Sequence, residues 1–258
     1  MGKFFNVTVV PEIPASKQHA GAFAGGDLLF DWTSFEIPKG GARLIGATFL
    51  VRPKGNATPS PNEFGLNVCF ATNDTQAAGT INSTAANEPT NSYIGVIEID
   101  DANSYAGTIR STSIASTGRA SSDTMAMPGI VLCREDGFEG IGSNVGYDKF
   151  YMRGIARGAF DFTSINAIAE DTDAAHADSQ VITMDGTGMD VREHFIAGDV
   201  LHIGTSVGTP AADSLIGTVA SADSATQITL KAVSPTALVD GDILYNLNPI
   251  RIVLHLEK

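Results

Sequence analysis

Apolar residues recur at every second position in several short segments of this chain, and polar residues fill the positions between them. This period of two predicts half-buried β-strands, because successive side chains of a strand point to opposite faces of a sheet. Only residues 165–170 have the composition to begin a helix. The strand-like segments are residues 5–9, 28–33, 42–51, 64–70, 93–99, 129–133 and 147–162.

The last ten residues predict a strongly amphipathic strand, in which Ile250, Ile252, Leu254 and Leu256 share one face. This strand follows a segment of different charge. Residues 167–248 contain 2 basic and 12 acidic residues, a net charge of −10, whereas the rest of the chain has a net charge of −3. We interpret the acidic segment as an insertion, after which the chain returns to its first domain.

The predicted fold is therefore all-β with two domains. Residues 1–165 plus 249–258 form a jelly-roll-like β-sandwich, and residues 166–248 form an inserted acidic module. Five short strands within about 80 residues are typical of a small SH3-like or OB-like β-barrel, whose closure removes exposed strand edges. The expected strands of the module are residues 181–184, 198–201, 215–219, 227–230 and 241–244.

Two long polar stretches interrupt the strand pattern, at residues 72–92 and 102–125. Structureless loops of this length are uncommon inside domains and are often functional. They fit inter-subunit arms and plain surface loops equally well.

Composition excludes several classes of partner. The chain has 258 residues and a net charge of −13, which opposes binding to nucleic acid and to anionic membranes. The sequence shows neither a secretory signal nor an apolar run long enough to cross a membrane. We therefore expect no nucleic-acid partner and no membrane partner.

The segment from Gly204 to Gly208 fits the G-x-S-x-G pattern of a hydrolase nucleophile elbow, with Ser206 as the nucleophile. That elbow requires a strand before it and a helix after it in a parallel α/β sheet. No helical pattern follows Ser206, and the single downstream histidine, His255, lies on the terminal strand of the other domain. We interpret the segment as a turn and expect no catalytic residue.

Metal and cofactor candidates are equally weak. Hard cations prefer several oxygen ligands on one loop, but the acidic cluster between residues 171 and 178 lacks the spacing of a known calcium loop. We interpret it as a solvated linker and expect no metal. The run from Gly140 to Gly146 misses the dinucleotide-loop spacing by one residue, so we expect a turn before residue 147 and no cofactor. The cluster consists of Asp171, Asp173, His176 and Asp178.

Isolated aromatic and histidine residues are predicted to be structural. Trp32 alternates in phase with Leu28 and Phe30, which predicts burial, although a sugar-stacking platform is the alternative. His19, His194 and His202 have no partner at a recognisable spacing and are expected on the surface or in packing contacts.

The two cysteines, Cys69 and Cys133, each lie in an apolar strand-like run. We expect two buried thiols, since cysteine without a disulfide is often buried. A disulfide between adjacent strands is the alternative.

Residues 195–247 carry a recurring set of short motifs. A Gly-Asp pair precedes a hydrophobic strand at Gly198 and again at Gly241, and a G-T-V strand and an I-T-L strand lie between them. This segment is similar to small β-barrel modules of phage structural proteins. The module in which it lies covers about a third of the chain. The whole chain resembles virion structural proteins of tailed bacteriophages, especially capsid decoration (cement) proteins.

This resemblance implies a non-enzymatic protein that binds the major capsid protein lattice, is made in the host cytoplasm and resides in the virion. It also implies a homotrimer, in which Phe4 and Phe5 pack between subunits. Two other functions stay open. One is a tail or fibre-associated module that recognises host surface glycans, and the other is a hydrolase, which replacement of Ser206 by alanine would test.

Overall fold

The computed structural model describes residues 2–53, 65–86, 91–99, 104–106, 113–117, 129–133, 146–162, 168–169, 180–184, 190–205 and 211–258. Within these ranges the protein is all-β. Its strands pair in antiparallel fashion in three sheets, and none of these sheets closes into a barrel. The all-β prediction is therefore confirmed.

The first sheet has six strands and contains both ends of the described chain. β16 (Ile250–Glu257) lies between β1 (Phe4–Val9) and β3 (Ala42–Val51). Beyond β3 follow β7 (Ser113–Ser116) and β6 (Ser104–Ala106), and β8 (Val131–Leu132) also pairs with β3. Ile250, Ile252, Leu254 and Leu256 are all buried, which confirms the amphipathic strand predicted at the end of the chain.

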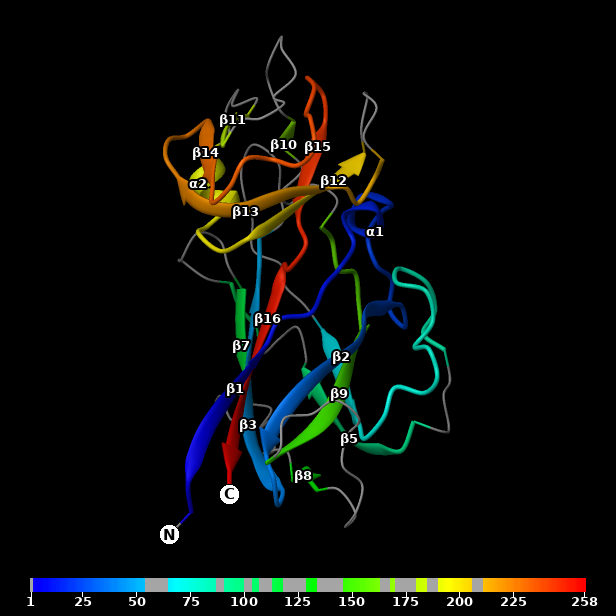
Figure 1. The fold of residues 1–258 in the computed structure, drawn as a ribbon. Coiled ribbons are helices and arrows are strands. Elements are labelled where there is room, and N and C mark those ends of the chain that lie inside the picture. The colour runs from blue at the N-terminus through cyan, green and yellow to red at the C-terminus, as the bar shows by residue number, and fades with distance from the viewer. Residues whose placement is uncertain are drawn as a thin grey trace.

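The second sheet has four strands. Their order is β2 (Leu28–Pro38), β9 (Tyr147–Ala156), β4 (Leu66–Ala71) and β5 (Tyr93–Ile99). Apolar side chains of both sheets form one hydrophobic cluster, to which β2, β4 and β9 contribute several phenylalanines. The two sheets therefore pack face to face as a sandwich, in the lower half of Figure 1.

The third sheet belongs to the acidic segment, in the upper part of Figure 1. Its strands lie in an open order from β10 to β11, so barrel closure is not observed in the part of the segment that the structure describes. The five strands predicted there are confirmed. The order is β10 (Ile168–Ala169), β15 (Ile243–Asn246), β12 (Val200–Thr205), β13 (Leu215–Ala222), β14 (Gln227–Leu230) and β11 (Val181–Thr183).

A second hydrophobic cluster lies on the third sheet and contains no residue of the first cluster. Most of its apolar side chains come from the strands of that sheet and from α2 (Val191–His194), and Met184, Phe195 and Leu238 come from the segments between them. Asp190 caps this short helix by accepting a hydrogen bond from the backbone N–H of Arg192.

A buried ion pair joins the sandwich to the third sheet. Arg52 follows β3, and its Nη2 donates to Asp199 Oδ2 at 2.7 Å and to the backbone oxygen of His194 at 2.7 Å. Burial raises the pKa of Asp199, although the positive charge of Arg52 opposes that shift. The ion pair thus stabilises the charged form of a carboxylate that is largely shielded from water.

The short helix α1 (Ala15–His19) forms the other half of this joint and packs against β12 and β15. The buried Gln18 donates from Nε2 to the backbone oxygens of Ile13 and Asn246, both at 2.7 Å. Asp213 reaches α1 from the third sheet and accepts hydrogen bonds from the backbone N–H and the hydroxyl of Ser16.

Helix positions were predicted poorly. Within residues 165–170, where the sequence favoured a helix, the structure describes only the two residues of the strand β10. The helices found in the described part of the chain, α1 and α2, are five and four residues long and show no amphipathic period. They are fixed by contacts from distant residues and by capping, which periodicity cannot reveal.

Candidate functional site

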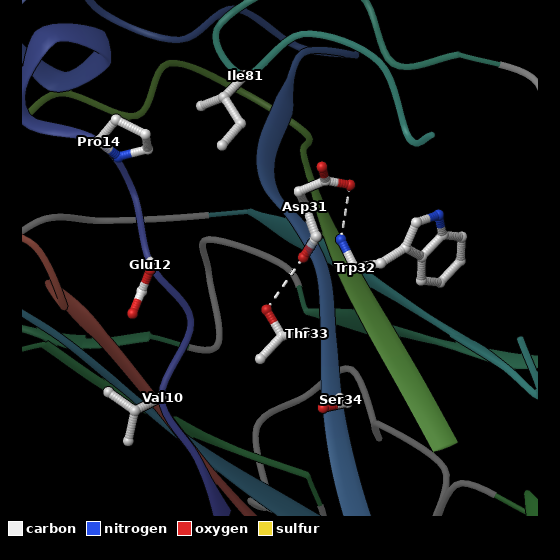
Figure 2. Close-up of a pocket in the computed structure, with 8 residues that line it drawn as sticks. All are labelled: Val10, Glu12, Pro14, Asp31, Trp32, Thr33, Ser34 and Ile81. Carbon is white, nitrogen blue, oxygen red and sulfur yellow. Dashed lines mark hydrogen bonds between the residues drawn. The ribbon is translucent and has the colours of Figure 1, made fainter. Parts of the chain in front are cut away.

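A cavity of about 420 Å³ opens beside β2, where the segment that follows β1 passes on its way to α1. Figure 2 shows this segment along one side of the cavity and β2 along the other. β2 is the terminal strand of its sheet, so the cavity lies at a sheet edge. Its lining residues are Val10, Glu12, Pro14, Asp31, Trp32, Thr33, Ser34 and Ile81.

An irregular turn of β2 shapes the cavity wall. The pairing of β2 with β9 shifts register between Phe30 and Thr33. Within that turn the Asp31 carboxylate accepts a hydrogen bond from the backbone N–H of Trp32 at 2.7 Å, and the Thr33 hydroxyl donates to the backbone oxygen of Asp31 at 3.0 Å. Figure 2 shows both bonds, with the indole ring of Trp32 pointing away from Glu12.

The carboxylates and hydroxyls that line the cavity offer oxygen atoms to a ligand. Glu12 and Asp31 supply carboxylates, and Thr33 and Ser34 supply hydroxyls, whereas no basic residue, histidine or cysteine is among the eight lining residues. Such a site suits a ligand with hydrogen-bond donors or positive charge. Across the described ranges, no three His, Cys, Asp or Glu side chains gather in a way that could hold a metal ion.

The indole ring of Trp32 belongs to an aromatic cluster on the outer side of the four-stranded sheet. The ring centroids of Trp32 and Tyr93 lie 5.9 Å apart. The guanidinium carbon of Arg153 lies 5.3 Å from the Trp32 centroid and 5.5 Å from the Tyr93 centroid, within cation–π range of both rings. The prediction that Trp32 lies in the core is wrong, because the shifted register of β2 turns its side chain outward.

Strand alternation extends this cluster over the sheet. Phe150 and Met152 of β9 point into the sandwich core, so Tyr151 and Arg153 point outward. On β5, Tyr93 is 40% and Val96 is 53% exposed. We call the outward residues Trp32, Tyr93, Val96, Tyr151 and Arg153 the aromatic face.

Part of the first long polar stretch is held against this face. The Trp32 Nε1–H donates to the backbone oxygen of Gln76 at 3.0 Å, and Arg153 Nη1 donates to that of Ala86 at 3.0 Å. Asn91 accepts from the backbone N–H of Gln76 and donates to its carbonyl. The described residues 72–86 are thus anchored by side chains of the aromatic face.

A polar array crosses the outer side of the six-stranded sheet. Asn6 Oδ1 lies 2.9 Å from His255 Nδ1, and His255 Nε2 lies 3.0 Å from the hydroxyl oxygen of Thr48, which lies 3.0 Å from that of Ser116. The order of hydroxyl, imidazole and amide matches that of hydrolase triads. None of these four residues lines the cavity, and we interpret the array as cross-strand pairing.

The sequence motifs have other outcomes. Gly204 and Thr205 end β12, and a Cβ added at Gly204 would lie 2.3 Å from the Tyr245 ring, so packing explains this glycine. Ser206 and the rest of the G-x-S-x-G segment lie outside the described residues, as do Asp171, Asp173, His176 and Asp178. Gly146, with a φ of 103°, directly precedes β9, and the rest of the predicted turn, residues 140–145, lies outside the described residues.

The three isolated histidines make structural contacts. His19 Nδ1 lies 3.1 Å from the Tyr245 hydroxyl, and His202 Nδ1 lies 2.8 Å from the backbone oxygen of Asp213. His194 is fully buried beneath the joint with Arg52.

The cysteine prediction is half correct. Cys69 and Cys133 are both thiols and form no disulfide with each other. Cys69 is buried, but Cys133 is exposed, because it lies just beyond the end of the short strand β8.

Comparison of the chain with protein-family models and with curated proteins gave no match. Within the described residues, no helix is long and apolar enough to cross a membrane. The functional assignment therefore rests on the surface chemistry of the protein and on the sequence resemblance.

Proposed function

We propose that this chain is a non-enzymatic structural protein of a bacteriophage virion, of the capsid decoration type, which binds the lattice of the major capsid protein through the aromatic face. The composition of that face carries the proposal. Trp, Tyr and Arg are the residues most enriched at the energetic centres of protein interfaces, and here all three types lie in mutual contact on one sheet.

The electrostatics of the chain support the same assignment. A protein with a net charge of −13 repels other acidic surfaces, and it also repels further copies of itself on a crowded particle. The aromatic face differs from this average, because Lys149 lies 5.2 Å from the centroid of the Tyr151 ring and Arg153 lies between two more rings. Arg153 itself is buried, at 5% exposure, so the half-buried Lys149 is the positive charge that this side of the sheet presents to an acidic partner.

The proposal includes a domain organisation. Residues 1–165 plus 249–258 form a jelly-roll-like sandwich, and residues 166–248 form an inserted module. The two separate hydrophobic clusters support this division, since each cluster draws its residues from one of the two segments. The module projects from one end of the sandwich, as in Figure 1, where its acidic surface would keep a coated particle soluble.

The first experiment measures the copy number of this chain relative to the major shell subunit in purified particles from its source, by quantitative mass spectrometry. A decoration protein is expected in numbers near those of the shell subunit. A few copies per particle would instead place the chain at the tail or portal, and absence from particles would refute the virion assignment.

A binding experiment tests the role of the aromatic face. Tyr93→Ala removes an exposed ring of this face and is expected to weaken binding to isolated shells by about tenfold or more, as loss of an interface anchor does. The matched control is Tyr147→Ala, because Tyr147 is similarly exposed, at 45%, and lies at the far end of β9. Equal binding by the two variants would contradict the proposed interface.

A second candidate function is recognition of host surface glycans by a tail-associated module. It is favoured by one observation: Trp32 is among the residues that line a cavity with carboxylates and hydroxyls, and its ring lies 5.9 Å from that of Tyr93. Rings of this kind stack on sugars, while oxygen atoms bind their hydroxyl groups. Glycan-array binding by the wild-type protein that is lost in Trp32→Ala would favour this function over capsid decoration.

A further inference from the structure

The carboxylate oxygens of the cavity beside β2 have few hydrogen-bond donors within the protein. With the described residues, Glu12 forms neither a hydrogen bond nor an ion pair. Asp31 Oδ1 accepts the hydrogen bond from the Trp32 N–H at 2.7 Å, but no described residue donates to Asp31 Oδ2. Most carboxylate oxygen atoms of this cavity can therefore accept hydrogen bonds from a ligand.

The side-chain donors of the cavity are largely engaged within the protein. The Trp32 Nε1–H donates to the backbone oxygen of Gln76 at 3.0 Å, and the Thr33 hydroxyl donates to that of Asp31 at 3.0 Å. The Thr33 oxygen can still accept a hydrogen bond. Of the eight lining residues, Ser34 alone retains a side-chain donor that no described residue accepts. A well-matched ligand must therefore supply several donors and few acceptors.

The acceptors come from both walls of the cavity. Figure 2 shows Glu12 on the segment after β1, whereas Asp31 and Thr33 lie on β2. The volume of about 420 Å³ lies within the range of ordinary small-molecule sites, about 300–1,000 Å³. A ligand of matching size would place a polar end between the carboxylates and an apolar body against the rest of the lining. The apolar lining residues include Val10, Pro14 and Ile81.

We propose that this cavity binds a primary ammonium group carried on a short alkyl chain. An ammonium presents several N–H donors and no acceptor, so it complements side chains that mainly accept hydrogen bonds. Its positive charge interacts with Glu12 and Asp31, and hydrogen bonds between ions of opposite charge are stronger than those between neutral groups. The alkyl chain contacts the apolar side chains of the lining.

A neutral sugar fits the same lining less well. Each sugar hydroxyl is an acceptor as well as a donor, and the Ser34 hydroxyl is the one side-chain donor available to it. An anionic ligand fits worse still, because the carboxylates repel it and none of the eight lining residues is basic. The charge and the hydrogen-bonding pattern of the lining therefore both favour an ammonium.

The first test titrates the isotope-labelled full-length protein with butylammonium chloride at constant ionic strength and follows the backbone amide chemical shifts by NMR. Saturable shifts are expected at Glu12, Thr33 and Ser34, with a dissociation constant in the millimolar range. The alcohol n-butanol has the same alkyl chain without the charge and should cause no saturable shift. Butyltrimethylammonium keeps the charge but has no N–H donor, and it should bind at least about tenfold more weakly.

Two isosteric variants locate the binding. Glu12→Gln and Asp31→Asn each remove one negative charge from the cavity, and each should weaken butylammonium binding by about tenfold. Asp31→Asn keeps an Oδ1 atom that accepts from the Trp32 N–H, so the turn of β2 is retained. The matched control is Glu36→Gln, because Glu36 lies on β2 opposite Lys149 of β9 and does not line the cavity. The control should bind like the wild type, and circular dichroism verifies that each variant is folded.

A comparison of two amines identifies the source of the ammonium, and neither source depends on the proposed virion function. Binding of N-acetyl-lysine methylamide at least as tight as that of butylammonium would indicate a lysine side chain of a partner protein. Much weaker binding of this compound would indicate a small free amine. The proposal would be overturned by three results: no saturable shift with butylammonium, an equal effect of Glu36→Gln and the two cavity variants, or tighter binding of glucose than of butylammonium.

Discussion

The two hydrophobic clusters are built from different side chains. The sandwich core contains many phenylalanines in ring contact, and Phe35 packs against both Phe70 and Phe150 at centroid distances of 6.1 and 6.0 Å. In the cluster of the acidic module, Phe195 is the one aromatic residue among the buried side chains that the structure describes. Large rings fill the gap of about 10 Å between two facing sheets, whereas one sheet of short strands needs mainly aliphatic side chains.

Charge separates the two regions as clearly as packing does. The segment 167–248 has a net charge of −10, against −3 for the rest. Where the two regions meet, Arg52 of the sandwich forms an ion pair with Asp199 of the module. The comparison teaches that the module has a small core of its own and relies on the sandwich to neutralise a buried carboxylate.

The largest expected effects on stability come from replacing a large buried side chain in each hydrophobic cluster by alanine. Phe70→Ala and Phe195→Ala each remove a fully buried ring and should lower the free energy of unfolding by about 3–5 kcal/mol. If the two cores are independent, calorimetry will show that Phe70→Ala lowers the melting temperature of the sandwich and Phe195→Ala that of the module. A common shift of one transition in both variants would show that the regions unfold as a single unit.

A smaller effect is expected at the joint. Arg52→Met leaves the Asp199 carboxylate buried without its cation and should cost about 3 kcal/mol near neutral pH. The folded-state pKa of Asp199 lies above its ordinary value of 3.8, and the variant should raise that pKa further. Asp199 thus contributes stability that is fully present below pH 3.8 and is lost as pH rises through the folded-state pKa.

Chemical denaturation at several pH values measures this effect. The destabilisation by Arg52→Met should be largest above the folded-state pKa and should shrink as acid neutralises the carboxylate. Asp199→Asn is the matched control, because it removes the titrating group and should give a nearly flat pH profile at this site. A pH-independent effect of Arg52→Met would mean that lost packing, and not charge, explains the change.

The smallest expected effects come from two glycines, one in each region, that leave room for a neighbouring aromatic ring. Gly154 in the sandwich and Gly204 in the module each lie against a buried ring, and an added Cβ would be 2.2 Å from Phe30 and 2.3 Å from Tyr245, respectively. Each glycine-to-alanine change should cost about 1–3 kcal/mol by overpacking. Gly158→Ala, where no atom lies within 4 Å of the added Cβ, should be nearly neutral in thermal melts.

The sequence predicted strands well because each strand repeats a local pattern that burial enforces. The terminal strand β16 and the five strands of the module lie where period-two alternation placed them. The short helices were missed because five and four residues are too few to show an amphipathic period. Asp213, almost two hundred residues from Ser16 in the sequence, completes the start of α1 and has no recognisable spacing to it.

The candidate site was harder to predict than the fold. Alternation placed Trp32 in the core, yet one irregular turn of β2 reverses the face on which its side chain lies. The sequence did not indicate the cation–π contacts of Arg153. The two rings that it contacts, those of Trp32 and Tyr93, come from β2 and β5, which are distant from β9 in the sequence. In the sequence of β9, Tyr151 and Arg153 alternate with the apolar residues Phe150 and Met152. This alternation was the one sign in the sequence that Tyr151 and Arg153 point outward.

The antiparallel pairing of β1 with β16 has a mechanical consequence. Tension that separates the two ends of the chain acts first on the Lys3–Lys258 hydrogen bonds and then on each following pair in turn. Bonds loaded one after another resist far less force than bonds loaded together in shear. The six-stranded sheet would therefore unzip from its end under a small force, while the four-stranded sheet would stay intact until β1 and β16 had peeled away.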